Sequence, residues 1–230
     1  MIMKEYEPTN LEIAEIFLRV LCDKAPEKAD VLFIHSSFKD QYLEDCLTRE
    51  ATFLWQKGKC EFIVINGMTS LECAKENNIS NGSEKYIERL ISGGVLRDNI
   101  LLIPSSHNTA EESQNILKMA KEKNWQTLLV MSTPHHQVRC FLTIVSTMEE
   151  LDIHIKVYNT TFHNVDWDMK VVRKVLGGQN VLGQKDEEGS FISLMKGELE
   201  RIKRYAIPSS NYNRSATIKE ALDYLEKRDK

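Results

Sequence analysis

Four short, uninterrupted apolar runs constrain the fold of this chain more than any other feature. They are VLFI at 31–34, FIVI at 62–65, ILLI at 100–103 and TLLVM at 127–131. Strands that are apolar at every position are typical of a parallel sheet with helices on both faces. A fifth run, IHIKVY at 153–158, alternates between apolar and polar residues, which favours an edge or late strand.

Segments with helical periodicity lie between and after these runs. We expect helices at about 40–57, 83–93, 109–124, 135–151, 190–205 and 216–228. The alternation predicts the α/β class, with a Rossmann-like, doubly wound and mainly parallel sheet of about five strands and extra C-terminal helices. The stretch GGQNVLGQKDEEGS at 177–190 has no regular pattern and predicts a mobile loop.

We expect one domain with three parts. Residues 1–28 hold an N-terminal helix that packs on the domain, with Thr9 and Glu12 at capping-box spacing. Residues 29–160 form the Rossmann-like core. Residues 161–230 supply a loop and helices that complete the same domain.

Charge and cysteine content exclude several classes of protein. The chain has 30 basic and 34 acidic residues, spread along its length, which argues against a general nucleic-acid binder. Its five cysteines form no CxxC pair, which is typical of reduced cytoplasmic thiols rather than disulfides or a zinc site. No apolar run reaches about 18 residues and no secretory pattern is present, so we expect a cytoplasmic protein without a membrane span. These patterns leave the oligomeric state open.

Polar residues follow each inner strand of the predicted sheet. Ligands of an open parallel sheet bind beyond the carboxyl ends of its strands, so these residues predict a polar pocket for a small anionic or hydroxyl-rich molecule. Gly67 would allow a close approach of the backbone to that ligand. The candidate ligand-binding residues are Ser36, Ser37, Asn66, Gly67, Ser106, His107, Asn108, Thr109, Ser132 and Thr133.

Helix capping explains only part of this pattern. Thr109 and Glu112 have capping-box spacing, and Thr133 is a candidate N-cap followed by Pro134 at the first helical position. The residues that capping leaves unexplained are His107, Asn108, His136 and Arg139.

His136 and Arg139 are three residues apart, so they share one face near the start of a helix. A cation there is unfavourable with the helix dipole, and Arg139 therefore requires an anionic partner. Glu84, Glu112 or a ligand phosphate would supply it. His135 points about 100 degrees away from His136 and is interpreted as packing or pocket wall.

The chain resembles the SanA/ElyC/YdcF family, described as a domain of unknown function. The resemblance spans roughly residues 29–205. The matching residues are Ser83 and Glu84 with GV at 94–95 and Ile100, then Ser106, Asn108, Thr109, Glu111 and Glu112, then Ser132, Thr133, His136 and Arg139, and finally GELERIKRY at 197–205.

This resemblance implies a Rossmann-like fold with a cleft at the strand ends. It also implies a link to S-adenosylmethionine binding for cytosolic members and to cell-envelope processes for membrane-anchored ones. The chain departs from the family pattern in having Ser36 and Ser37 in place of a glycine pair, Asn66-Gly67-Met68 in place of SGG, and Pro104 in place of an acidic residue.

Two classes of function follow from these residues. The first is a hydrolase or group-transfer enzyme acting on a small phosphorylated, nucleotide-like or sugar-like metabolite. In it His136 is the general acid or base, Arg139 holds an anionic group, and Glu84 orients His136 or activates water. The alternative is a nucleotide- or S-adenosylmethionine-binding module without catalysis of its own. No G-x-G fingerprint follows a strand, which counts against NAD.

A protein-interaction role is a third class, but no stretch predicts an exposed apolar patch. A metal site is not predicted either, because the candidate ligands form no HxxxH or HxH pair. Those candidates are His107, His135, His136, His163 and Asp166.

Overall fold

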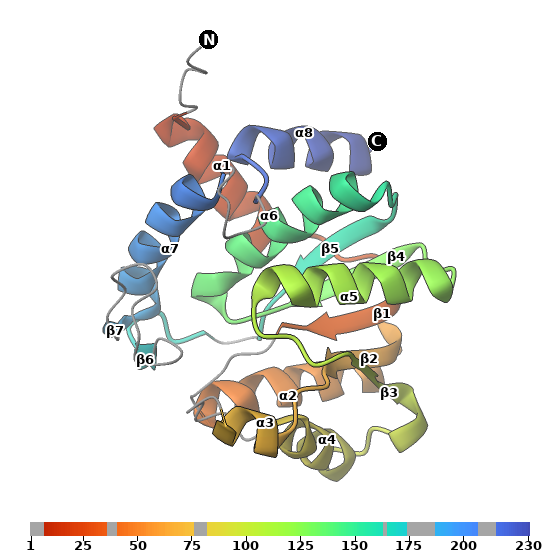
Figure 1. The fold of residues 1–230 in the computed structure, drawn as a ribbon. Coiled ribbons are helices and arrows are strands. Elements are labelled where there is room, and N and C mark those ends of the chain that lie inside the picture. Colours follow the sequence, from red (N-terminus) through yellow and green to blue (C-terminus); the bar gives the residue numbers. More distant parts are fainter. Residues whose placement is uncertain (1–6, 36–40, 76–81, 163–164, 174–186, 207–214) are drawn as a thin grey trace.

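A five-stranded parallel sheet with the order β3-β2-β1-β4-β5 forms the centre of the molecule (Figure 1). The computed structural model describes residues 7–35, 41–75, 82–162, 165–173, 187–206 and 215–230. The strands are β1 (Ala29–Ile34), β2 (Cys60–Asn66), β3 (Ile100–Ile103), β4 (Thr127–Met131) and β5 (Lys156–Thr160). The expected Rossmann-like, doubly wound α/β architecture is confirmed.

Helices cover both faces of this sheet (Figure 1). One face carries α2 (Gln41–Gln56), α3 (Ser70–Lys75) and α4 (Gly82–Ser92), and the short helix η1 (Arg97–Asn99) leads into β3. The other face carries α1 (Asn10–Leu21), α5 (Thr109–Glu122), α6 (Pro134–Leu151) and α8 (Ile218–Arg228). Helix α7 (Phe191–Tyr205) packs beside α6, next to an antiparallel pair formed by β6 (Lys170–Arg173) and β7 (Glu187–Ser190).

Each inner strand contributes to two hydrophobic cores, which explains why the apolar runs are continuous. Val31 and Phe33 of β1 face the core under α1, α5, α6 and α8. Leu32 and Ile34 of the same strand face the core under α2 and α4. Successive side chains of a strand point to opposite faces, so a strand covered on both sides needs apolar residues at every position.

The last strand of the sheet begins later than the predicted 153–158. Asp152 ends α6 in the left-handed conformation, and the N–H of Ile153 still donates to the carbonyl of Met148. These residues therefore belong to the helix terminus, and pairing with β4 begins only at Lys156. Within the predicted loop, residues 187–190 form β7, and residues 177–186 lie outside the described residues.

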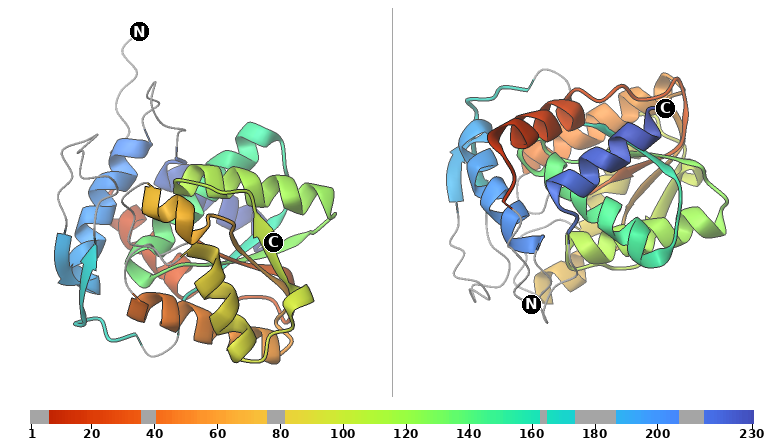
Figure 2. Two further views of the ribbon diagram at one scale, coloured as in Figure 1. Left: turned by 60° about the horizontal axis from the view of Figure 1, so that its bottom comes forward. Right: turned by 90° about the horizontal axis from the view of Figure 1, so that it is seen from above.

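The first helix has the capping box expected from the sequence, with Thr9 and Glu12 bonded reciprocally. This helix lies beside α8 in both views of Figure 2 and also packs against α6. Cys46, Cys60, Cys73 and Cys140 are buried thiols, whereas Cys22 is exposed. Among the described helices, none is long and apolar enough to cross a membrane.

The sheet has a topological switch point between β1 and β4. The strands that follow β1 in sequence, β2 and β3, lie on one side of it, and β4 and β5 lie on the other. In an open parallel sheet, the connections on either side of such a switch point run to opposite faces and leave the strand ends accessible between them. His35 follows β1 directly, and Ser132 follows β4. The predicted ligand-binding residues that the structure describes thus follow strand ends at the carboxyl edge of the sheet, with Ser132 and Thr133 next to this switch point.

Candidate functional site

Helix α5 begins with an Asn108 cap, one residue before the predicted position. The side chain of Asn108 accepts hydrogen bonds from the backbone N–H groups of Ala110 and Glu111, both at 3.0 Å. Glu111 reaches back, accepting from the N–H of His107 at 2.8 Å and from the side chain of Asn108 at 2.7 Å. The expected capping box of Thr109 and Glu112 is therefore wrong by one residue.

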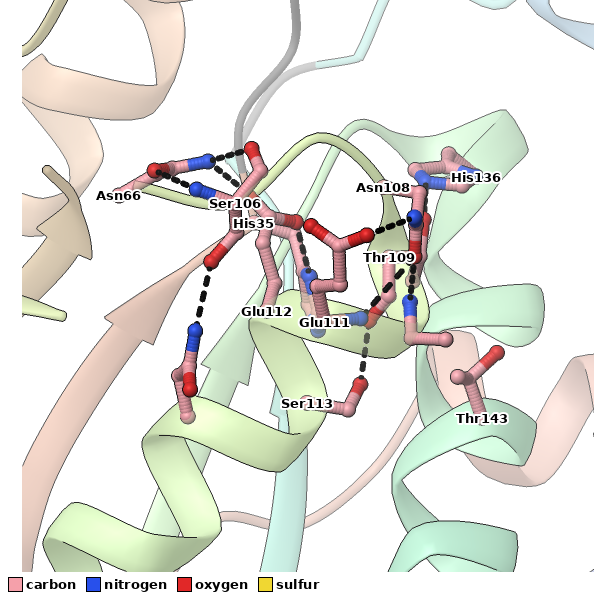
Figure 3. A network of polar contacts seen from close by, with 12 residues as sticks. His35, Asn66, Ser106, Asn108, Thr109, Glu111, Glu112, Ser113, His136 and Thr143 are labelled. Carbon is pink, nitrogen blue, oxygen red and sulfur yellow. Dashed lines mark hydrogen bonds and ion pairs between the residues drawn. The ribbon is translucent and has the colours of Figure 1, made fainter. Parts of the chain in front are cut away.

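This shift makes the side chains of Thr109 and Glu112 available for other contacts. The two residues are three apart on α5, so they lie on the same side of its first turns. Each contacts a different histidine: Glu112 contacts His35, and Thr109 contacts His136 (Figure 3). The start of α5 therefore links two histidine clusters at the carboxyl edge of the sheet.

The first cluster is fully buried and is centred on Glu112. One carboxylate oxygen, Oε2, lies 2.8 Å from Nδ1 of His35, and the other, Oε1, accepts from Nδ2 of Asn66 at 3.0 Å. Asn66 also donates to the carbonyl of Ser106 at 2.7 Å, while its Oδ1 accepts from the N–H groups of Ser106 and Met68. Asn66 thus joins the ends of β2 and β3 to helix α5.

Asn66 and Ser106, both predicted to bind a ligand, are members of this network. The amide of Asn66 uses its oxygen and its nitrogen within the protein, and Ser106 Oγ donates to the carbonyl of Pro104 while accepting from Asn115. Their hydrogen bonds hold Glu112 in place against His35. We conclude that the two residues shape the site through Glu112.

Gly67 lies where the end of β2 passes close to the end of β3. Its N–H donates to the carbonyl of Ile103 at 3.0 Å, and a Cβ atom at this position would overlap that carbonyl oxygen. The glycine is therefore required where β2 passes the end of β3. The approach of the Gly67 backbone to a bound molecule stays a prediction.

The second cluster joins α5, α6 and α7. Arg139 Nε donates to Oε2 of Glu198 at 2.6 Å, and Arg201 donates to Oε1 of the same carboxylate at 3.1 Å. His136 lies next to the same carboxylate, with Nδ1 at 3.6 Å from Glu198 Oε2. Its Nε2 lies 3.4 Å from Thr109 Oγ1 and 3.5 Å from Arg139 Nη2.

Glu198 is therefore the anionic partner that Arg139 requires, in place of the expected Glu84 or Glu112. Burial alone lowers the pKa of Arg139, but the adjacent Glu198 carboxylate outweighs this effect and raises the pKa, so the guanidinium stays charged. The guanidinium also faces the ring of Tyr205 at 5.9 Å. Helix α7 thus closes the Arg139 side of the cluster.

The hydrogen bonds of Glu84 connect it to helix α3. Its carboxylate accepts from the N–H and the hydroxyl of Ser70, at 3.0 and 3.3 Å, and so binds the first residue of α3. The carboxylate next to His136 is Glu198. A catalytic role of Glu84 stays a prediction from the sequence.

The start of α6 matches the sequence prediction. Thr133 is the N-cap and Pro134 the first helical residue, and the carbonyl of Thr133 accepts from the N–H groups of His136 and Gln137. His135 is buried and stacks on Phe191 of α7, in agreement with a packing role. This arrangement fixes His136 at the edge of the sheet.

The remaining candidate residues follow strands β1, β3, β4 and β5 in the sequence. Ser132 is buried, and its carbonyl accepts from Thr161 Oγ1 at 2.9 Å. His107 is exposed and contributes its N–H to the helix cap. Ser36, Ser37 and His163 lie outside the described residues. Among the residues that the structure does describe, no group of three or more His, Cys, Asp or Glu side chains is arranged to hold a metal ion.

Sequence reasoning missed the roles of two residues. The motif GELERIKRY contains Glu198 but does not show that this residue pairs with Arg139. Its spacing of three from Arg201 on an amphipathic helix does indicate an ion pair. His35 was noted only as the first polar residue after β1. Its pairing with Glu112 depends on the capping register of α5, for which the sequence allows two positions.

Comparison with known proteins adds no family assignment. No model of a known protein family matches the chain, and no curated protein matches it. The functional interpretation therefore depends on the geometry of the two histidine clusters.

Proposed function

We propose that this chain is an enzyme of the hydrolase or group-transfer class that acts on a small phosphorylated metabolite at the carboxyl edge of the sheet. The observation that carries the proposal is the contact of His136 Nε2 with Arg139 and Thr109, beside the buried carboxylate of Glu198. In this proposal His136 is the general acid or base, and Arg139 binds the anionic group of the substrate.

The contacts of His136 support acid–base chemistry because they favour one tautomer of the neutral ring. A guanidinium N–H can only donate, so the Nε2 atom that faces Arg139 holds a lone pair. The proton of the neutral ring is then on Nδ1, on the side of Glu198. An imidazole held in this way has the lone pair of Nε2 available to accept a proton.

The geometry of Arg139 supports the binding of an anion. Its Nε makes the short bond to Glu198, whereas the contacts of its two outer nitrogens with described residues are long, at 3.4 Å to Thr109 and 3.5 Å to His136. Those two nitrogens form the fork that suits a phosphate or carboxylate group. Glu198 holds the guanidinium in place, so less conformational freedom is lost when an anion binds.

The resemblance to the SanA/ElyC/YdcF family is in keeping with this proposal. The residues that carry the resemblance and contact one another in the second cluster are Thr109, His136, Arg139, Glu198 and Arg201.

The alternative, a module for S-adenosylmethionine or a nucleotide, finds less support in the described residues. Rossmann-like folds hold such ligands with a glycine-rich turn after the first strand and a carboxylate on the ribose. The chain has no glycine before Gly58. Asn66 stands at the end of β2, and its amide is used by Ser106, Met68 and Glu112. The chain thus lacks the glycine-rich turn after β1, and it has Asn66 instead of a carboxylate at the end of β2, so these positions do not match that mode of binding S-adenosylmethionine or a nucleotide.

Substitution of His136 and Arg139 tests the proposal. We expect wild-type protein to bind inorganic phosphate in a calorimetric titration and to hydrolyse at least one member of a panel of phosphate monoesters. His136→Gln should keep phosphate binding and lose about 10²- to 10⁴-fold in kcat, the usual contribution of a general acid or base. Arg139→Lys keeps the charge but not the fork, and should weaken phosphate binding.

His154→Gln is the matched control, because His154 is an exposed histidine whose ring lies 3.2 Å from Asp152, at the other end of α6. It should behave as wild type in both assays. Wild-type protein that neither binds phosphate nor turns over any ester would refute the proposal. So would turnover that is unchanged in His136→Gln.

A further inference from the structure

His35 has a polar atom that the fold leaves without a partner. The imidazole has no exposed surface, and its Nε2 makes no hydrogen bond to any described residue. A buried polar atom without a partner costs free energy, and such atoms are rare in native proteins. This one stands directly after β1, at the switch point of the sheet where ligands of open α/β folds bind.

The neighbours of His35 favour one tautomer of its neutral ring. The Oδ1 of Asn66 accepts two backbone N–H groups, so its Nδ2 must face Glu112. An ionised Glu112 then accepts from Asn66 on one oxygen and from His35 Nδ1 on the other. The proton of a neutral ring is therefore on Nδ1, and Nε2 presents a lone pair.

Several contacts hold the ring in this orientation. Its edge meets the buried ring of Phe33 in a T-shaped arrangement, with the ring centroids 4.7 Å apart. The backbone N–H of His35 donates to the carbonyl of Met131 in β4. An imidazole fixed by a carboxylate at Nδ1, with an Nε2 that has no partner among the described residues, is suited to accept a hydrogen bond from a ligand that reaches it, as in enzymes that use a carboxylate–histidine pair.

Helix α5 connects His35 to the site of the proposed function. Glu112, which holds His35, and Thr109, which contacts His136 and Arg139, are one helical turn apart on the same side of α5. A small ligand that places an anionic group at Arg139 can thus present a second polar group toward His35.

We propose that Nε2 of His35 accepts a hydrogen bond from a hydroxyl group of the substrate. This inference rests on the proposed function and narrows it: the substrate is a phosphate ester of a polyol or sugar, rather than of a simple alcohol. Glu112 and Asn66 are positioning residues, because they act on the ligand only through the imidazole.

Two phosphate esters that differ only in their hydroxyl groups test this inference. We would titrate the full chain with sn-glycerol 3-phosphate and with n-propyl phosphate in a calorimeter. Wild-type protein should bind glycerol 3-phosphate about tenfold more tightly, the usual value of one hydrogen bond. His35→Leu should bind the two esters equally and keep the wild-type affinity for propyl phosphate, which also shows that the variant is folded.

A second measurement needs no variant. The ¹⁵N resonance of His35 Nε2 in wild-type protein should be that of an unprotonated nitrogen, and it should shift on addition of glycerol 3-phosphate but not of propyl phosphate. This readout decides the question even if His35→Leu does not fold.

The outcomes separate the two proposals. Equal binding of both esters by wild-type protein, lost in Arg139→Lys, would overturn the hydroxyl contact and leave the proposed function standing. A preference for glycerol 3-phosphate that survives in His35→Leu would also overturn the hydroxyl contact. Failure of both esters and of inorganic phosphate to bind would overturn the proposed function together with this inference.

Discussion

Asn108 determines which side chains of α5 are available to the site. The sequence Asn-Thr-Ala-Glu-Glu contains two overlapping capping patterns, Asn108 with Glu111 and Thr109 with Glu112. In the structure the first pair caps the helix, and Glu112 is buried against His35. The capping position of α5 thus decides whether a carboxylate reaches the first histidine.

Asn108→Ala should therefore destabilise the protein more than Thr109→Ala. The first change removes the acceptor for two backbone N–H groups, which costs about 1 kcal/mol. The second removes only long contacts at 3.4 Å and leaves the cap in place. Urea unfolding followed by circular dichroism measures both, and a larger loss in Thr109→Ala would contradict the observed cap.

Asp30 gives a pH-dependent contribution to stability. Burial acts to raise the pKa of its carboxyl, but hydrogen bonds from Gln126 and Thr127 outweigh burial and lower the pKa below its ordinary value of 3.8. A lowered folded-state pKa means that the contribution is present above pH 3.8 and is lost as the pH falls through the folded-state pKa.

Asp30→Asn should accordingly be less stable than wild type by about 1–3 kcal/mol at pH 7, because Oδ2 accepts three hydrogen bonds. The difference should shrink as the pH falls below 3.8. Urea unfolding at several pH values measures it. A difference independent of pH would mean that the charge of Asp30 contributes nothing.

At the level of elements, the passage of β2 past β3 depends on Gly67. Its N–H pairs with the carbonyl of Ile103, and there is no room for a side chain beside that oxygen. The two strand ends that lead to Asn66 and Ser106 are therefore held together at this point.

Gly67→Ala should destabilise the protein by about 1–3 kcal/mol, the usual cost of excess volume in a packed region. Met68→Leu, which conserves volume at the next buried position, is the control and should cost less. Chemical unfolding measures both changes. Equal stability of Gly67→Ala and wild type would show that β3 can move away without cost.

Most elements could be predicted from the sequence because burial on two faces leaves a clear pattern. The runs at 100–103 and 127–131 coincide with β3 and β4. Helix α3, with six residues, is too short to show a helical period, and β6 and β7, with the sequences KVVR and EEGS, lack the continuous apolar run of the sheet strands, so the sequence does not predict them. The late start of β5 depends on how α6 ends, which the alternation of 153–158 does not reveal.

For the whole molecule, the prediction of the site was limited by distances along the chain. His136 and Arg139 were identified because they lie on one helix. Their carboxylate, Glu198, lies 59 residues beyond Arg139, and no local pattern relates the two. The sequence thus predicted His136 and Arg139 at the start of α6, but it did not predict that α7 supplies the carboxylate of Glu198.

A buried ion pair joins distant parts of the molecule. Arg228 of α8 binds both carboxylate oxygens of Asp23, each at 2.7 Å, and donates to the carbonyl of Val157 in β5. Asp23 in turn accepts from Asn159, which accepts from Gln137 beside His136. Hydrogen bonds thus run from α8 to the start of α6.

Arg228→Met should cost about 3–5 kcal/mol, because it leaves Asp23 as a buried charge without its partner. Arg19→Met is the matched control: Arg19 pairs with Asp229 on the exposed side of the same helices, and this change should cost at most about 1 kcal/mol. The free energy of unfolding in urea measures both. A cost for Arg228→Met no larger than that of the control would show that Asp23 is readily rehydrated.

The pairing of Asp23 with Arg228 also sets an order of events during synthesis on the ribosome. The two residues are 205 positions apart, so Asp23 emerges long before its partner exists. Until then, the carboxylate of Asp23 lacks its partner Arg228, and the side of α1 that packs on α8 in the folded protein is not covered by α8. Chaperones that bind nascent chains therefore have a defined interval in which to act on this segment, and it ends when α8 leaves the exit tunnel.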